Sequence, residues 1–315
     1  MPNVFLSGCG IQVSNEYIFR IINLTTHRLL SLHADYRRYA KEWLTAAKDT
    51  TDTQRMEIMF DSGAFTAWSK KQPDIEVKEL LAIYKSAFTF CSTAFKEVWF
   101  INLDKIPGEP GRTATPDEIQ DAIRVSDDNY KILHSELGYR VLPVFHQSED
   151  VHRLTEIRDL NPEYICVSPR NDLHEKERRA WSARVHKLTK GVKTHGLAAT
   201  GDKMMLEVPW HSVDSASWIH AAAFGAIYFR PNDTAISSLQ ISDQSPSRKV
   251  WGKHADTLGP KARQQIEQEA SILGVTWDEL REKYGARMLY NAHILQAVGS
   301  KENKKVPVQS TLLEL

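Results

Sequence analysis

The chain has 315 residues, of which 42% are hydrophobic and 25% are charged. These values are typical of a globular protein with a sizeable core and exclude a disordered or fibrous chain, and the length allows one large domain or two ordinary ones. Forty basic residues balance forty acidic residues, so any contact with nucleic acid has to come from a local patch and not from overall charge.

The cysteines and the hydropathy pattern indicate the compartment. Cys9, Cys91 and Cys166 form no CxxC pair and predict neither a disulfide framework nor a zinc cluster. The N-terminal stretch MPNVFLSGCG is too short and too polar for a signal peptide, and nowhere do 18 apolar residues run together. We therefore expect a cytoplasmic protein without membrane contact.

Short runs rich in β-branched and aromatic residues recur along the chain, and amphipathic segments separate most of them. In chain order, the strand candidates are NVFLS, EIMFD, EVWFINLD, RVLPVFHQ, YICVSP, VKTHGLA, HSVDS and AIYFR. A helix is expected over 75–94. Another should begin after Thr115 as N-cap, with Pro116 at the first helical position and Glu118 three residues after the cap, and end at Gly138. This alternation predicts parallel strands joined by crossover helices.

Eight strand candidates predict a (β/α)8 barrel of the TIM type over residues 1–232, although counting alone leaves an open doubly wound sheet as the alternative. Residues 199–210 leave room for only one short helix, GDKMMLEV, between the sixth and seventh strands. The segment from 233 to 315 contains a polar stretch and two helix candidates, KARQQIEQEASILG and TWDELREKYGARMLYNAHILQAVG. We expect a C-terminal helical extension there, ending in a loose tail.

Polar residues stand where the apolar strand candidates end. In chain order they are Ser7, Asp61, Asp104, Gln147, Ser168, His195, Asp214 and Arg230. The carboxyl ends of barrel strands converge on one face, and such folds carry their chemistry there. Three aspartates in equivalent places therefore predict a shared site.

Four short motifs, taken in order, resemble the tRNA-guanine transglycosylase superfamily over about residues 1–230. DSGAF at 61–65 is similar to that family's DSGGF or DSGSF element, and LDKIP at 103–107 to its base-recognition turn. HGLA at 195–198 is similar to its GGLA loop, and DSASW at 214–218 to the DSASY around the archaeal-type nucleophile. The chain resembles most closely the branch, found in phages and bacterial genomic islands, that inserts 7-deazaguanines into DNA.

One departure from the family concerns its zinc site. The tRNA enzymes carry three cysteines and a histidine near the C-terminus, whereas no cysteine follows Cys166 here. We therefore expect neither a metal nor another cofactor. The expected location becomes the cytoplasm of a bacterium or of a phage-infected host.

The resemblance implies a pentosyltransferase that exchanges guanine in DNA for a 7-deazaguanine such as 7-cyano-7-deazaguanine. Asp214 would attack C1′ to form a covalent glycosyl-enzyme, and Asp61 would carry a proton between the departing and arriving bases. Asp104 would accept hydrogen bonds from the N1–H and 2-amino groups of a guanine-like ring. The other expected substrate contacts are Phe65, as a stacking face, and Gln147, His195, Gly196 and Leu197. The base has to be extruded or single-stranded, and the sequence leaves open whether helper proteins open the duplex.

Each of these positions has a structural alternative. Asp61 and Asp214 can be helix N-caps, and Asp104 can be a turn residue. Gln147 and His195 can be satisfied polar residues, and Phe65 can belong to the core. At the level of function, the alternatives are a tRNA-guanine transglycosylase that lacks zinc, and a catalytically silent barrel that binds nucleic acid or a partner modification enzyme.

Two basic stretches are candidate nucleic-acid surfaces. Residues 170–193 carry eight basic side chains against three acidic ones, and residues 245–265 carry five against one. The first stretch can equally be a solvated helix face. In the second, basic side chains surround an aromatic one, which suits phosphate contact combined with stacking. The predicted DNA contacts there are Arg248, Lys249, Trp251 and Lys253.

Overall fold

The structure is a computed structural model of the chain and describes residues 1–8, 15–189, 191–199, 201–232 and 235–300. Its centre is an all-parallel sheet of nine strands in the order β5-β4-β3-β2-β1-β9-β8-β7-β6. The strands are β1 (Asn3–Leu6), β2 (His27–Ser31), β3 (Glu57–Asp61), β4 (Glu97–Ile101), β5 (Val141–Leu142), β6 (Val144–His146), β7 (Tyr164–Ser168), β8 (Lys193–Gly196) and β9 (Ser212–Ser215).

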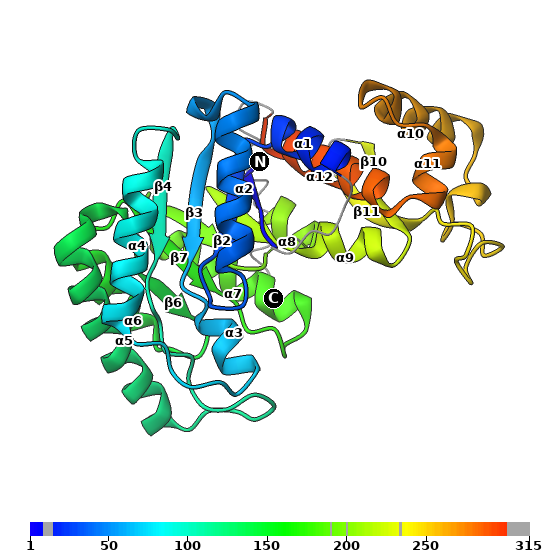
Figure 1. Cartoon of the computed structure of the whole chain (residues 1–315). Coiled ribbons are helices and arrows are strands. Elements are labelled where there is room, and N and C mark those ends of the chain that lie inside the picture. The colour runs from blue at the N-terminus through cyan, green and yellow to red at the C-terminus, as the bar shows by residue number, and fades with distance from the viewer. Residues whose placement is uncertain (9–14, 190, 200, 233–234, 301–315) are drawn as a thin grey trace.

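The two edges of this sheet belong to one continuous segment. Pro143 alone separates β5, which pairs with β4, from β6, which pairs with β7. Proline has no N–H to donate to a ladder, but the Pro143 carbonyl still accepts a hydrogen bond from the Cys166 N–H at 2.9 Å. The sheet is therefore a nearly closed barrel, roughly like a TIM barrel, with helices around it (Figure 1).

One of the expected strands needs correction, and one barrel strand was not expected. AIYFR does not belong to the barrel, because β10 (Ala226–Asn232) pairs antiparallel with β11 (Ala235–Gln240) in a separate sheet. Arg230 therefore does not stand at a barrel strand end. The place in the ring is filled by β2, which the sequence pattern did not indicate and which lies between β1 and β3. Since β1 pairs with both β2 and β9, no position remains for a further strand after β9.

The helices begin and end largely where the sequence indicated. Thr115 accepts from the Glu118 N–H in a capping box, and the helix ends at Gly138 with φ of 62°. The segment GDKMMLEV contains the expected short helix, and the helix expected over 75–94 spans 77–91. The helices up to β10 are α1 (Asn15–Leu24), α2 (Arg37–Thr50), α3 (Ala64–Ser69), α4 (Val77–Cys91), α5 (Pro116–Leu137), α6 (Val151–Asp159), α7 (Glu175–Leu188), α8 (Asp202–Glu207) and α9 (Ser217–Ala223).

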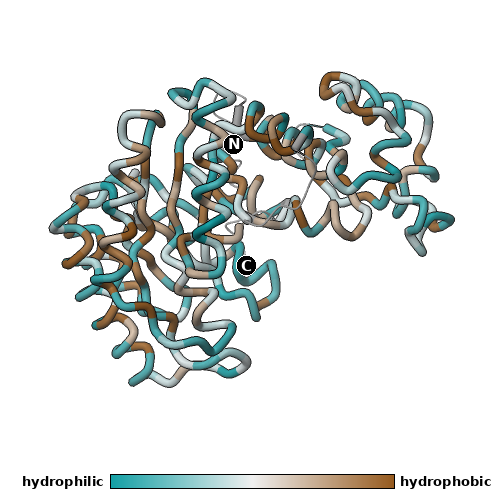
Figure 2. Tube along the Cα trace, in the orientation of Figure 1, coloured by the Kyte–Doolittle hydropathy of each residue, from teal (hydrophilic) through white to brown (hydrophobic). Residues whose placement is uncertain are grey.

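Side chains pack on both faces of the barrel wall. The interior holds a cluster whose buried members all lie on strands: Phe5, Leu29, Met59, Trp99, Ile101, Leu142, Val144, Tyr164 and Cys166. Alternate residues of the same strands face outward and pack against α2, α4 and α5. Hydrophobic and hydrophilic residues accordingly alternate along the outer helices (Figure 2). The barrel interior is thus filled with side chains, and a reaction site has to lie at an end of the barrel.

The C-terminal part contains α10 (Pro260–Ile272), α11 (Trp277–Glu282) and α12 (Tyr284–Ser300). The second expected helix is therefore two, separated at Lys283. α12 packs on β1, α1, α9 and β10. Its Gln296 side chain donates to the Val4 carbonyl at 2.6 Å and accepts from the Thr26 N–H at 2.7 Å. α12 thus joins the barrel wall beside β1.

The expected boundary after residue 232 falls between β10 and β11, which pair with each other. The division into two domains stays a prediction. The expected tail lies largely outside the described residues.

Candidate active site

Asp61, Asp104 and Asp214 form an electrostatically coupled cluster at the carboxyl ends of the strands. Asp61 ends β3, Asp104 follows β4, and Asp214 lies near the end of β9. Burial, together with the negative charges of Asp214 and Asp104, raises the pKa of Asp61 from 3.8 to about 7. Burial and the same three carboxylates also raise the pKa of Cys166, in the barrel core beneath. The three carboxylates therefore lie in one electrostatically coupled group at the strand ends.

None of these aspartates has the purely local role that was the alternative. The N-cap of α3 is Gly63 and that of α9 is Ala216, and neither helix has a side-chain cap. Gly63 is required where it is, because its φ is 88° and a Cβ there would lie 2.7 Å from the Cβ of His33. Asp104 binds a side chain on another strand instead of its own turn. The N-cap interpretation is therefore wrong for Asp61 and Asp214.

Asp214 is held through one carboxylate oxygen. Its Oδ1 accepts from the Ala198 N–H at 3.1 Å and lies 3.2 Å from Nε2 of His195. Ala198 adopts a left-handed φ of 51°, which is uncommon for a residue with a Cβ. Within the described part of the chain, no contact engages Oδ2. Asp214 is 8% exposed. Because Oδ1 already has two partners, Oδ2 is the atom that remains for a substrate.

Asp104 is held by His146, which the sequence analysis did not single out. Nε2 of His146 lies 2.8 Å from Oδ2 of Asp104. Burial lowers the pKa of His146, but the hydrogen bond with Asp104 and the charges of Asp104 and Glu149 outweigh it, and the net effect is a raised pKa. Burial also raises the pKa of Glu149 to about 7. A histidine at the strand end, directly before Gln147, was the only available signal.

The loop that carries Asp104 is fixed by hydrogen bonds to its neighbours. The Lys105 N–H donates to Ser126 Oγ at 2.8 Å, and the Asn129 amide donates to the Leu103 carbonyl at 2.8 Å. Trp68 of α3 donates to the Gly108 carbonyl at 2.9 Å. A cleft of about 400 Å³ between α3, this loop and α5 includes Asp104 in its lining, and its volume is within the range of small-molecule sites.

The remaining predicted substrate residues are placed unevenly. Phe65 is 53% exposed on the first turn of α3, so it is not a core residue. Gln147 accepts from the Arg170 N–H at 3.0 Å, and His195 is fully buried against Asp214. The Leu197 N–H donates to the Val167 carbonyl at 2.9 Å and is already engaged.

Gly196 has a packing reason to be glycine. A Cβ at this position would lie 2.8 Å from the Cβ of Ala199 and 2.9 Å from the ring of Trp210. Distances below 3.0 Å are essentially never seen for real Cβ atoms. The turn after β8 therefore needs a glycine for close packing, whatever the backbone contacts.

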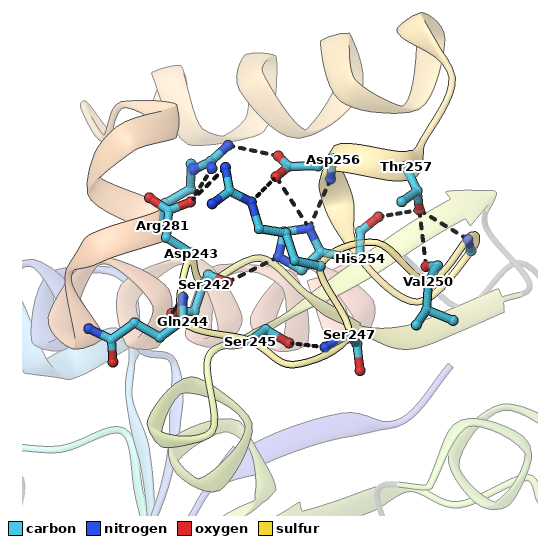
Figure 3. Close-up of polar contacts among 12 residues, drawn as sticks. Ser242, Asp243, Gln244, Ser245, Ser247, Val250, His254, Asp256, Thr257 and Arg281 are labelled. Carbon is cyan, nitrogen blue, oxygen red and sulfur yellow. Dashed lines mark hydrogen bonds and ion pairs between the residues drawn. The ribbon is translucent and has the colours of Figure 1, made fainter.

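The predicted DNA contacts lie on the loop 243–257, where a network of ion pairs fixes the backbone (Figure 3). Arg248 pairs with Asp256 at 3.0 Å and with Asp243 at 3.7 Å, and Arg281 pairs with both aspartates. The Arg248 guanidinium is therefore engaged in ion pairs within the protein. Lys249, Trp251 and Lys253 are exposed, and Trp251 is 86% exposed.

This loop lies apart from the strand ends. In Figure 1 the α10–α11 region projects to the upper right, while α3 lies at the lower side of the barrel. The other basic stretch includes α7, where Arg179 pairs with Glu175 at 3.1 Å and Glu207 at 3.2 Å, as on a solvated helix face.

No known protein family matches the sequence, and no curated protein matches it significantly. Within the described ranges, no three or more histidine, cysteine, aspartate or glutamate side chains form a group that could hold a metal ion. No helix in that part of the chain is long and apolar enough to span a membrane. Cys91 and Cys166 are buried free thiols, and Cys9 lies outside the described residues.

Proposed function

We propose that the protein is a base-exchanging pentosyltransferase that replaces guanine in DNA with a 7-deazaguanine. The observation that carries the proposal is the difference between two neighbouring carboxyl groups. Asp61 has a pKa of about 7. Asp214 is held through Oδ1, and within the described residues no contact engages its Oδ2. Carboxyl groups whose environments separate their proton affinities are the usual acid and nucleophile of glycosyl transfer.

The first half of the proposed reaction breaks the glycosidic bond. Oδ2 of Asp214 attacks C1′, the bond from C1′ to N9 of guanine breaks, and its electron pair goes to the departing base. Asp61, protonated near neutral pH, gives its proton to that base. The product is a covalent ester between Asp214 and the deoxyribose, which keeps C1′ activated.

The second half reverses these steps with a different base. The ionised Asp61 removes the N9 proton of the incoming 7-deazaguanine, and N9 attacks C1′ as the ester bond to Asp214 breaks. Two inversions at C1′ restore the original configuration. Asp61 ends protonated and Asp214 ends ionised, so both are ready for another cycle.

Asp104 is the proposed recognition group for the base. Oδ2 accepts from His146, and a carboxylate oxygen has lone pairs for a further bond. Oδ1 and the second lone pair of Oδ2 therefore face a donor pair such as the N1–H and 2-amino groups of guanine. Phe65, exposed on the first turn of α3, supplies a stacking face for a base extruded from the duplex.

We propose DNA as the polymer, bound in part by Lys249, Trp251 and Lys253. We further propose that β5 and β6 count as one strand of a (β/α)8 barrel and that residues 233–315 are its helical extension. The absence of a cysteine after Cys166 supports DNA over tRNA, since the tRNA enzymes that the motifs resemble bind zinc with cysteines near the C-terminus.

The test offers purified protein labelled guanine or 7-cyano-7-deazaguanine together with single-stranded DNA, duplex DNA or unmodified tRNA. We expect incorporation into DNA, and a covalent DNA adduct that Asp214→Asn abolishes while the variant stays folded. Incorporation into tRNA alone would favour the zinc-less tRNA enzyme. Binding of DNA without exchange of any base would favour the silent barrel.

A further inference from the structure

A chain of buried polar groups runs from Asp214 into the barrel wall across three neighbouring strands. Nε2 of His195 lies 3.2 Å from Oδ1 of Asp214, and Nδ1 of His195 lies 2.5 Å from Oγ of Ser212. The Ser212 hydroxyl also contacts the Tyr164 hydroxyl. His195 pairs in register with Ser212 of β9, and Tyr164 belongs to the adjoining strand β7. The chain therefore depends on the order β7-β8-β9.

His195 is enclosed on all the sides that the structure describes. It has no exposed surface, and the rings of Phe5 and Tyr164 stand edge-on to it, with centroids 5.6 and 6.2 Å away. Because the imidazole has no exposed surface, a base cannot contact it in this arrangement of the side chains. His195 is thus unsuited to the direct base contact that the sequence suggested.

The direction of the hydrogen bonds follows from what each group can donate. An ionised Asp214 only accepts, so Nε2 of His195 carries a hydrogen. Burial raises the pKa of Tyr164 well above its ordinary value, so its hydroxyl keeps its hydrogen. Among the described contacts, Ser212 Oγ is the acceptor within reach of that hydrogen. The hydrogen of Ser212 is then satisfied only if Nδ1 of His195 accepts it. One neutral tautomer of His195, with its hydrogen on Nε2, satisfies all four groups.

We infer that His195 is a positioning residue that, with Ser212 and Tyr164 behind it, fixes Oδ1 of Asp214 and leaves Oδ2 directed at the sugar. This inference rests on the proposed function for its consequence in catalysis. The Ala198 N–H is the second donor to the same oxygen, and Ala198 keeps its left-handed φ of 51° at that junction. A nucleophile held by two donors on one oxygen cannot rotate freely, and small misplacements of a reacting atom have large effects on rate.

The first test needs no substrate. Nitrogen-15 NMR of histidine-labelled full-length protein, with His195 identified by its absence in His195→Gln, should show a neutral imidazole with hydrogen on Nε2. Ser212→Ala leaves the Asp214 acceptor in place and should keep the hydrogen on Nε2, whereas Asp214→Ala removes that acceptor and should raise the population with hydrogen on Nδ1. A doubly protonated His195, or an Nδ1–H tautomer in the wild type, would overturn the inference.

The second test separates positioning from base binding by kinetics. His195→Met removes the donor and should lower kcat by roughly 100-fold or more, the scale expected for a misplaced nucleophile, with KM for the free base within twofold of wild type. His195→Gln keeps an N–H donor near the position of Nε2 and should recover part of kcat. Ser212→Ala should lower kcat less than His195→Met does, and Tyr164→Phe should lower it less than Ser212→Ala.

The matched controls are His152→Met and Ser135→Ala, at exposed positions on α6 and α5, which should leave kcat unchanged. Thermal denaturation of each variant would identify loss of folding. A raised KM for the base with unchanged kcat in His195→Met would overturn positioning in favour of base contact. Wild-type protein without exchange activity would refute the proposed function, and the NMR result would still decide the hydrogen-bond chain.

Discussion

Asp61→Asn tests the raised pKa of Asp61, caused first by burial and then by the charges of Asp214 and Asp104, without any assumption about substrate. The pKa of Asp61 rises from 3.8 to about 7 on folding. A carboxyl group with a raised pKa binds more protons in the folded state between those values, so it removes stability as pH rises through that window. Each pKa unit corresponds to about 1.4 kcal/mol. The full effect at pH 8 is therefore on the order of 4 kcal/mol, of which about 2–3 kcal/mol develops above pH 5.

Asparagine cannot ionise, and its carbonyl oxygen can still accept from Ser31 or Gly63, which bond to Asp61 in the wild type. The stability of Asp61→Asn relative to wild type should therefore increase by roughly 2–3 kcal/mol between pH 5 and pH 8, measured by urea denaturation. Any constant effect of the amide cancels in this comparison. Asp159→Asn, at an exposed position on α6, is the control. A difference between variant and wild type that does not change with pH would refute the raised pKa of Asp61.

Three further predictions concern the base, the DNA and the C-terminal helix. Asp104→Ala should weaken binding of guanine by roughly 2–4 kcal/mol and that of hypoxanthine less, and equal losses in calorimetry would contradict recognition of the 2-amino group. Lys249→Ala combined with Lys253→Ala should weaken DNA binding and lower the salt slope by about two; an unchanged slope in fluorescence titrations would place DNA elsewhere. Gln296→Ala should cost roughly 2–4 kcal/mol in urea denaturation, because buried backbone groups lose their partner, whereas the exposed Gln244→Ala should be neutral.

Several of the barrel strands that the sequence revealed, namely β1, β3, β4 and β7, have continuous apolar runs. Strands of a parallel sheet are covered on both faces and need such runs. β2 has only Leu29 and Leu30 between polar residues, and its Arg28 is buried. That guanidinium donates to the Leu6 carbonyl at 2.5 Å and lies 5.3 Å from the ring of Trp43. Partners so distant in sequence made β2 invisible to a local pattern.

AIYFR shows the converse limit, because a local pattern does not specify which sheet a strand will join. The orientation of the site histidines could not be predicted from a local pattern either. The positions of Asp104 and Asp214 at the carboxyl ends of strand candidates predicted that both lie on one face. Whether His146 and His195 point toward them depends on strand register. The ion pair of Arg248 with Asp256 could not be predicted for a similar reason, since only the fold of the loop brings the two residues together. A DNA contact by Arg248 stays a prediction.

The convergence of three carboxylates also bears on the roles proposed for the aspartates. Like charges brought together in a buried place destabilise a fold unless donors compensate them. Asp104 has the His146 imidazole, and Asp214 has His195 and the Ala198 N–H. Asp61 interacts instead with the hydroxyl of Ser31 and the N–H of Gly63, and no imidazole bonds to it among the described residues.

The proton that such a cluster retains near neutral pH therefore resides on the carboxylate with the weakest compensation, which is Asp61. A protonated carboxyl group is a poor nucleophile and a competent acid. The reverse assignment, with Asp61 attacking C1′ and Asp214 donating the proton, would require Asp214 to carry a hydrogen while His195 and the Ala198 N–H both donate to it. The hydrogen bonds around the cluster thus support Asp214 as nucleophile and Asp61 as acid and base, independently of any likeness between motifs.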